Sequence, residues 1–245
     1  MVRARDAVRE GARGGEASNA LLPAGRERIH YSHHSSPRYL PEAAHPFHEL
    51  REAGVKVHFA TPYGKPAPVD EGSVKNFTDN ISVQFLDQFV EAGHLKHDLV
   101  KPLGELKPED YDVVFVPGGH GPMFDLALAT NITGDFLAKA YKAGKIVSAV
   151  CHGPAALVSA KLSEDQPLVK GHEVACFTND EEAAVKLDKY MPFALESKLR
   201  ELGAHTVGGK PWEPLVVTSD RLITGQNPNS GTPVGKAIVK KLHAS

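Results

Sequence analysis

The sequence predicts an α/β fold in which a mostly parallel sheet is covered by helices on both faces. The first observation is that strand-like apolar runs alternate with helical patterns along the chain, which is the order of strands joined by crossover helices. The second is that residues 113–116 and 146–150 form short, continuous apolar runs that each lead into a glycine-containing turn. Runs of this kind are typical of parallel strands buried on both faces.

The elements of the first half follow this alternation. Pro41 suits the first turn of a helix and Gly54 is a natural stop, so a helix is expected over 41–54. The remaining expectations, in chain order, are a strand at 55–62, a turn-rich stretch at 64–79, an amphipathic segment at 80–100, a strand at 113–116 and a helix at 131–143.

The second half repeats the unit of strand, sharp turn and helix around residues 146–160. A further strand is expected over 172–177 and a helix over 191–203, which Gly203 stops. The segment 214–228 reads as two short strands around a turn at Ser219 and Asp220, and 233–244 as a closing amphipathic helix.

Bulk properties narrow the function classes. The 245 residues are enough for one large α/β domain, which we expect over 39–245, and residues 1–38 read as an atypical, poorly ordered arm. A formal net charge of −2 provides no basic field for nucleic acid, and no apolar run approaches the ~20 residues of a membrane span. Two cysteines and no apolar leader segment indicate a reducing compartment, so we expect a cytoplasmic protein.

Cys151 is the sharpest local feature. An apolar strand runs into it and a helix is expected directly after it, which is the geometry of a nucleophile elbow at the carboxyl ends of the strands. A helix N-terminus favours thiolate over thiol, so we expect an ionised and accessible sulfur. A lone cysteine at a strand end is more often a small core residue, but this context favours the nucleophile. Cys176, inside an apolar strand, reads as core.

Four motifs together carry a family resemblance. The sequence AVCHGPA, preceded by VFVPGGHGPMFDL and EAAHPF and followed by TGQNPNS, resembles the DJ-1/PfpI superfamily. Within it, the match is to the Hsp31-like, glutathione-independent glyoxalase III (D-lactate dehydratase) group. The resemblance covers residues from about 37 to 242. It implies a flavodoxin-like, class I glutamine amidotransferase-like sandwich.

The resemblance also implies roles for individual residues. Cys151 matches the family nucleophile, Glu42 the acid that reaches the sulfur, and His152 the histidine that follows the nucleophile. Glu182 falls where the family has the acid that orients this histidine, although Glu181 and Asp180 are adjacent candidates.

Two glycines complete the implied site. Gly118 and Gly119 match the oxyanion and substrate-binding loop, with the amides of Gly119 and His152 where the family stabilises an oxyanion. His120 reads as a loop residue. No metal site is expected, because the histidines show no convincing ligand spacing.

Each position has a second explanation from the residues alone. Glu42 lies near a helix start, where an acid is favoured by the dipole. His152 could bond within its turn, Glu182 could be a solvated acid at a helix entry, and the glycines could serve only the turn.

The resemblance implies conversion of methylglyoxal to D-lactate through a cysteine hemithioacetal and an enediol, with no cofactor, and it fits a homodimer. Ammonia-releasing amidotransferase chemistry is disfavoured, since the late loop 224–228 offers no histidine or acid. The alternatives are a holdase chaperone in the stress response, a redox sensor, and a protein or nucleotide deglycase that uses the same cysteine.

One stretch departs from the family pattern. The family begins with a buried strand shortly before the Glu42 segment, but the matching residues 25–39 are polar and basic. We therefore expect this strand to be missing or to form poorly from residues 20–32. A missing central strand would leave neighbouring backbone groups unpaired.

Overall fold

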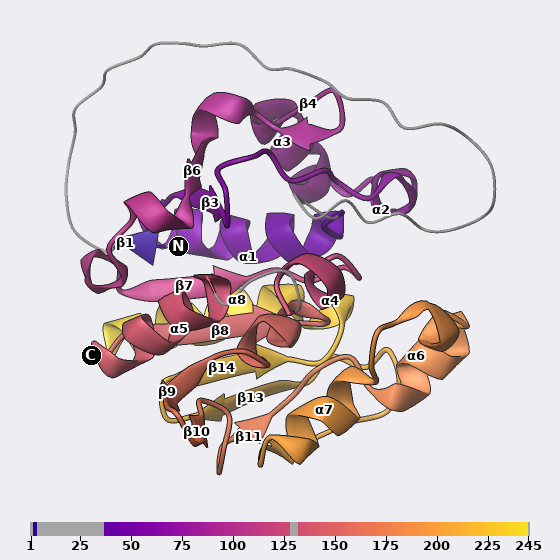
Figure 1. The fold of residues 1–245 in the computed structure, drawn as a ribbon. Helices are drawn as coiled ribbons and strands as arrows, with labels where there is room; N and C mark the ends of the chain where they lie inside the picture. The colour runs from indigo at the N-terminus through magenta and orange to yellow at the C-terminus, as the bar shows by residue number, and fades with distance from the viewer. Residues whose placement is uncertain (1, 4–36, 128–131, 245) are drawn as a thin grey trace.

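A six-stranded sheet forms the centre of the computed structural model, which describes residues 2–3, 37–127 and 132–244 (Figure 1). The strand order is β13-β14-β8-β7-β1-β2. The strands are, in that order, Val216–Ser219, Leu222–Gly225, Ile146–Val150, Val113–Val116, Val2–Arg3 and Lys56–Val57. The central strands β7, β8 and β14 are parallel, as expected. This confirms the flavodoxin-like α/β fold predicted from the sequence.

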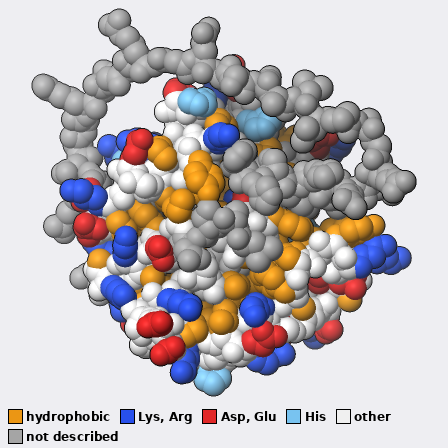
Figure 2. Space-filling view, in the orientation of Figure 1, with side chains coloured by type: hydrophobic (Ala, Val, Ile, Leu, Met, Phe, Trp, Pro, Cys, Tyr) orange, Lys and Arg blue, Asp and Glu red, His pale blue; other side chains and the backbone are white. Residues whose placement is uncertain are grey.

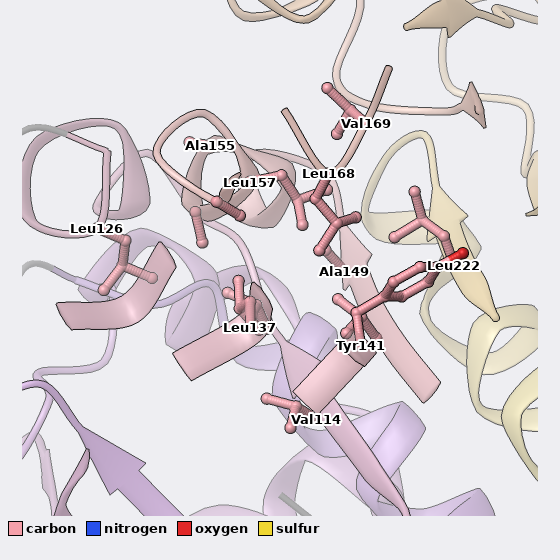
Figure 3. Close-up of a cluster of buried hydrophobic side chains, with 14 of the residues drawn as sticks. Val114, Leu126, Leu137, Tyr141, Ala149, Ala155, Leu157, Leu168, Val169 and Leu222 are labelled. Carbon is pink, nitrogen blue, oxygen red and sulfur yellow. The ribbon is translucent and has the colours of Figure 1, made fainter. Parts of the chain in front are cut away.

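Residue alternation in the parallel strands gives the sheet two apolar faces. Val114, Val147 and Leu222 lie in one buried cluster, whereas Val113, Ile146 and Ile223 lie in another. Successive side chains of a strand point to opposite faces, so both faces need a covering layer. The first cluster, shown in Figure 3, includes Leu137 and Tyr141 of α5 (Ile132–Lys142).

The second face is covered by α1 (Leu40–Glu52) and α8 (Gly231–His243), which pack on each other. They contribute Leu50, Val234 and Ile238 to the second cluster.

The remaining elements of the first half are β3 (Phe59–Thr61), α2 (Glu71–Asn76), α3 (Asn80–Phe89), β4 (Val90–Glu91), β5 (His94–Leu95), η1 (His97–Leu99), β6 (Val100–Pro102), η2 (Leu103–Glu105), η3 (Pro108–Asp110) and α4 (Pro122–Asp125). The remaining elements of the second half are η4 (Gly153–Leu157), β9 (Lys161–Ser163), β10 (Gln166–Pro167), β11 (Glu173–Val174), α6 (Asn179–Val185), η5 (Asp188–Tyr190), α7 (Leu195–Glu201), β12 (His205–Thr206) and η6 (Pro228–Ser230).

Helix α1 has the ends that the sequence predicts. Pro41 occupies its first turn, where a missing backbone N–H costs nothing, and Gly54 follows it with a φ of 73°. The helix therefore begins at the carboxyl-end edge of the sheet and places Glu42 in its first turn there.

Three predicted elements differ in the structure. The strand predicted over 55–62 is split into β2, in the main sheet, and β3, which pairs with β6 in a separate sheet. The segment after Cys151 is the 3₁₀ helix η4 rather than an α-helix. It packs closely on β7, since a Cβ at Gly153 would lie 2.3 Å from the Val116 carbonyl oxygen. The strand predicted over 172–177 is regular only in β11, which pairs with β12 outside the main sheet. Beyond it, the amide of Ala175 donates to Thr224 Oγ1 and that of Phe177 to the Cys151 carbonyl, so neither joins a ladder.

The position between β7 and β2 is taken by Val2–Arg3, which runs antiparallel to both neighbours. The pairing is short, with Val2 opposite Val57 and Val113, and Arg3 opposite Lys56. The strand considered for residues 20–32, and most of the expected arm 1–38, lie outside the described residues. The sheet therefore receives a neighbour at this position from the start of the chain.

The view in Figure 2 shows positive and negative side chains interspersed, with hydrophobic side chains between them. Among the described helices, none has the length and apolar content to cross a membrane.

The packing of α1 on α8 gives a stability prediction. A Cβ at Gly235 would lie 2.8 Å from Glu49 Cβ and 3.0 Å from Pro46 Cα, so Gly235→Ala overpacks this contact. Overpacking costs ~1–3 kcal/mol, and the higher helix propensity of alanine returns ~1 kcal/mol. We expect a net loss of up to ~2 kcal/mol in the free energy of unfolding, measured by urea denaturation.

Gly104→Ala is the matched control, since its Cβ would meet no atom within 4 Å and its φ is not positive. It should change stability by less than ~0.5 kcal/mol. A Gly235→Ala protein as stable as the wild type would show that α1 is not held closely against α8.

Candidate active site

Cys151 lies in a strained elbow between β8 and η4. Its φ is 60°, a left-handed value that a residue with a Cβ rarely adopts. Two backbone hydrogen bonds hold it there: the Cys151 amide donates to the Gly225 carbonyl at 2.9 Å, and the Phe177 amide donates to the Cys151 carbonyl at 2.9 Å. The elbow geometry that the sequence predicts for Cys151 is therefore present.

The state of the sulfur differs from the prediction of an accessible thiolate. Cys151 is only 3 % exposed, and burial, together with the charge of Glu42, raises the pKa of its thiol well above the usual value. The amides of His152 and Gly119 act in the opposite direction but do not outweigh burial. The helix-dipole argument fails here because the following element is a single short 3₁₀ helix and the site is closed to solvent.

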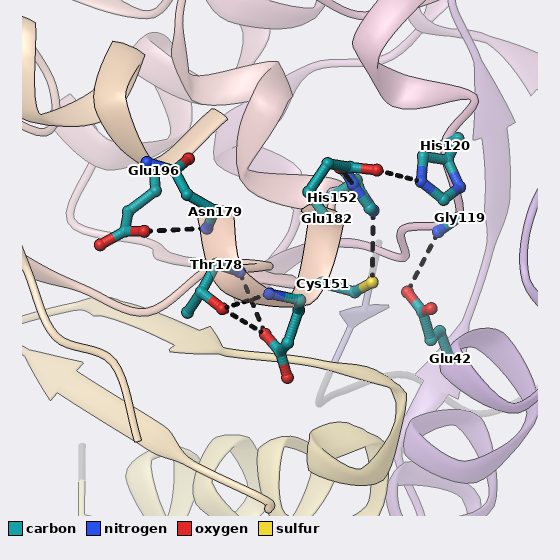
Figure 4. A network of polar contacts seen from close by, with 10 residues as sticks. Glu42, Gly119, His120, Cys151, His152, Thr178, Asn179, Glu182 and Glu196 are labelled. Carbon is teal, nitrogen blue, oxygen red and sulfur yellow. Dashed lines mark hydrogen bonds and ion pairs between the residues drawn. The ribbon is translucent and has the colours of Figure 1, made fainter. Parts of the chain in front are cut away.

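Glu42 lies beside this thiol and is fully buried. Its Oε2 accepts hydrogen bonds from the amides of Gly119 at 3.2 Å (Figure 4) and Gly118 at 2.9 Å. Its Oε1 has no hydrogen-bond partner among the described residues. Burial raises the pKa of Glu42 to about 8, although Cys151 and the two amides lower it in part. Glu42 and Cys151 therefore form a coupled pair that retains a proton near neutral pH.

Gly118 allows this arrangement because it has no side chain. A Cβ there would lie 2.5 Å from Glu42 Oε2 and 2.7 Å from the His152 amide nitrogen. The amides of Gly118 and Gly119, in the loop predicted to bind an oxyanion or substrate, donate instead to the Glu42 carboxyl.

His152 connects the thiol to a second acid. Its Nδ1 lies 3.4 Å from Cys151 Sγ, and its Nε2 lies 2.6 Å from Glu182 Oε2. Glu182 is in the first turn of α6, and its other oxygen, Oε1, lies 2.9 Å from His120 Nε2. The rings of the two histidines are 4.1 Å apart between centroids.

The carboxyl of Glu182 is ionised, whereas that of Glu42 holds a proton. Burial acts to raise the pKa of Glu182, but the hydrogen bonds from His120 and His152 outweigh it and lower the pKa to about 2. Burial lowers the pKa of His152 to about 4, so its ring is neutral. Since ionised Glu182 only accepts, Nε2 of His152 carries the ring proton and Nδ1 faces the sulfur as an acceptor.

The structure thus brings together Cys151, His152, Glu42 and Glu182, with the Gly118–Gly119 loop between them. Glu181 has another task. It caps α6 through Thr178 and accepts from Asn227 Nδ2 at 2.9 Å. Cys176 is buried in the core, as the sequence predicts.

His120 is the residue that the sequence analysis overlooked. Two features could have identified it: it lies in the loop after β7, and β7 is the parallel neighbour of β8, which ends just before Cys151. Carboxyl ends of adjacent parallel strands meet at one edge of the sheet, where ligands bind.

The loop at residues 224–228 stabilises the structure through side-chain hydrogen bonds. Gln226 Oε1 accepts from the Gly209 amide at 2.7 Å, and Asn227 Nδ2 also donates to the Glu213 carbonyl at 2.8 Å. Neither residue supplies a base to Cys151, which agrees with the exclusion of amidotransferase chemistry.

Comparison with known proteins identifies the fold and the family. Glutathione-independent glyoxalase HSP31 of Saccharomyces cerevisiae is 30% identical over 203 residues, covering 78% of this chain and 83% of that protein. Protein/nucleic acid deglycase HchA of Staphylococcus aureus is 28% identical over 206 residues, covering 80% and 69%. The crystal structure of glyoxalase III from Candida albicans superposes with a TM-score of 0.74 at 28% identity, over 83% of this chain and 87% of that chain.

The sequence model of the DJ-1/PfpI family matches residues 40–241, a range that contains Glu42, the glycine loop, the cysteine elbow and Glu182. The chain belongs to the DJ-1/PfpI family.

Proposed function

We propose that this chain is a glutathione-independent glyoxalase, a D-lactate dehydratase of the glyoxalase III type that converts methylglyoxal to D-lactate without a cofactor. One observation carries the proposal: a fully buried Glu42 carboxyl, with one oxygen lacking a partner among the described residues, shares its surroundings with the Cys151 thiol. A nucleophile and a carbon base in one closed site suit a small dicarbonyl substrate.

The first step is addition of the sulfur to the aldehyde carbon. In its reactive form the pair of Glu42 and Cys151 has lost one of its two protons, so the thiolate attacks while the remaining proton moves to the aldehyde oxygen. The product is a hemithioacetal with a hydroxyl on the former aldehyde carbon, and Glu42 is left as a carboxylate. A second route to the thiolate is transfer of the thiol proton to Nδ1 of His152, which lies 3.4 Å from Sγ.

The second step moves hydrogen between adjacent carbons. Glu42 removes the proton from the former aldehyde carbon to form an enediol, and then delivers it to the neighbouring carbon. The hydroxyl proton moves from the first oxygen to the second. The result is a lactoyl thioester, in which one carbon has been oxidised and its neighbour reduced without external electrons.

Hydrolysis completes the cycle. Water adds to the thioester carbon, the C–S bond breaks, and lactate leaves with the proton returned to the pair of Cys151 and Glu42. The amides of Gly119 and His152, which interact with Sγ, are the donors proposed for the oxyanion in this step. His152 assists proton movement with its ring fixed by Glu182.

The sequence relationships support this choice of substrate class, since relatives over most of the chain are named glyoxalases. The deglycase name of the Staphylococcus aureus relative favours a second candidate, removal of methylglyoxal adducts from proteins or nucleotides by the same sulfur. Turnover rates on free methylglyoxal and on a methylglyoxal-modified peptide distinguish the two. A cytoplasmic location and a homodimer stay predictions.

Loss of the nucleophile tests the reaction directly. With methylglyoxal and without glutathione, the wild-type chain should form D-lactate, detected with D-lactate dehydrogenase, and Cys151→Ala should form none. Cys176→Ala is the matched control, because that thiol is buried in the core cluster away from the site. Undiminished D-lactate formation by Cys151→Ala would refute the proposed function.

Glu42→Gln tests the carbon base. The amide oxygen can still accept from Gly118 and Gly119, so the fold should be kept, while the group can no longer take a proton. We expect kcat to fall ~10²–10⁴-fold, the usual contribution of a general base. Glu49→Gln, in the same helix, should keep the wild-type rate, and a Glu42→Gln enzyme of full activity would remove Glu42 from the mechanism.

The raised pKa of Glu42 sets a pH dependence. The fully protonated pair of Glu42 and Cys151 lacks both thiolate and base, and the pair loses its first proton near pH 8. We therefore expect kcat/KM to rise with pH below about 8 and to level off above it. Initial rates from pH 6 to pH 9, corrected for spontaneous methylglyoxal decay, measure this, and a flat profile contradicts it.

A further inference from the structure

Three ligand-type side chains converge beside the thiol. His120 Nε2, His152 Nε2 and the Glu182 carboxylate each offer one ligand atom, and these atoms all lie within 4.8 Å of one another. They come from the loop after β7, the elbow after β8 and helix α6, so tertiary structure alone assembles them. Both histidines present the same nitrogen to the same carboxylate, at 2.9 Å and 2.6 Å.

The charges of this cluster suit a cation. A carboxylate lies between two imidazoles, and each Nε2 is separated from coordination only by the hydrogen-bonded proton between it and the carboxylate. Two imidazoles and one carboxylate are the ligands of many open zinc sites, in which water takes the fourth position. His152 is 1 % exposed, whereas the His120 side chain is 22 % exposed, so an ion would enter from the His120 side.

We propose that His120, His152 and Glu182 form a binding site for a divalent ion of the zinc class. The ion takes the place of the two Nε2 protons between the histidines and the carboxylate. Zinc–nitrogen bonds are ~2.0–2.1 Å long, so the three ligand atoms must move closer together. His120 is the ligand best able to move, since it lies in a loop and is the most exposed of the three.

Metal coordination by His152 changes which of its ring nitrogens carries the proton next to the sulfur. A neutral imidazole has one ring proton, which must move from Nε2 to Nδ1 when Nε2 binds a metal. In His152, Nδ1 then becomes a donor toward Cys151 Sγ and can no longer accept the thiol proton. Bound metal therefore removes His152 and Glu182 from proton transfer and inhibits turnover, a consequence that rests on the proposed function.

Direct binding tests the site without any reference to activity. The full-length chain, freed of metal with a chelator, is titrated with zinc chloride by calorimetry, and one stoichiometric site is expected. His120→Asn should weaken it by more than the ~10–100-fold that loss of an outer-shell partner costs. His45→Asn is the matched control, because His45 Nε2 pairs with Asp79 at 3.2 Å without a second histidine. Circular dichroism melting checks that both variants are folded.

Ligand identity is tested with cobalt(II) and Cys151→Ala. Cobalt bound through nitrogen and oxygen gives visible d–d bands without the near-ultraviolet charge transfer of a thiolate ligand, and Cys151→Ala should bind zinc as tightly as the wild type. Wild-type affinity in His120→Asn, or loss of the site in Cys151→Ala, overturns the proposal. Activity is measured on the metal-free chain: zinc binding by a chain whose metal-free form lacks glyoxalase activity supports the site and refutes the function, whereas glyoxalase activity without zinc binding does the reverse.

Discussion

The active site depends on the left-handed backbone of Cys151. A non-glycine residue at a φ of 60° is held against a cost of ~1–3 kcal/mol by its surroundings. Hydrogen bonds from the Cys151 amide to Gly225 and from Phe177 to the Cys151 carbonyl supply part of that restraint. This backbone turns the sulfur toward α1 and the glycine loop, so every distance in the site follows from it.

Close approach between the loop after β7 and the elbow after β8 is the second requirement. A Cβ at Gly118 would touch the Val150 carbonyl at 2.6 Å, and one at Gly153 would touch the Val116 carbonyl at 2.3 Å. Because these glycines let two backbones meet, the Glu42 carboxyl can be held by loop amides while it faces the thiol. The elbow and the acid are therefore positioned by one packing arrangement.

Two carboxyl groups in this site are driven to opposite states. Around Glu42, burial outweighs the thiol of Cys151, the two loop amides and the charge of Arg38, so the group holds a proton near pH 7. Glu182 has two imidazole donors, which outweigh burial and keep it ionised. Because their pKa values differ in this way, Glu42 can carry a proton while Glu182 keeps a fixed negative charge. The same contrast lets Glu182, and not Glu42, favour a cation.

The sequence by itself determined the alternation of strands and helices, the elbow at Cys151 and the start of α1 at Pro41, because apolar periodicity and turn residues act locally. With the family motifs, it also indicated Glu42, His152 and Glu182. Tertiary structure alone decided that His120 joins Glu182, that the sulfur is buried and un-ionised, and that Val2–Arg3 lies beside β7. These outcomes depend on contacts between segments far apart in the chain and on the solvent they exclude, which no local pattern encodes.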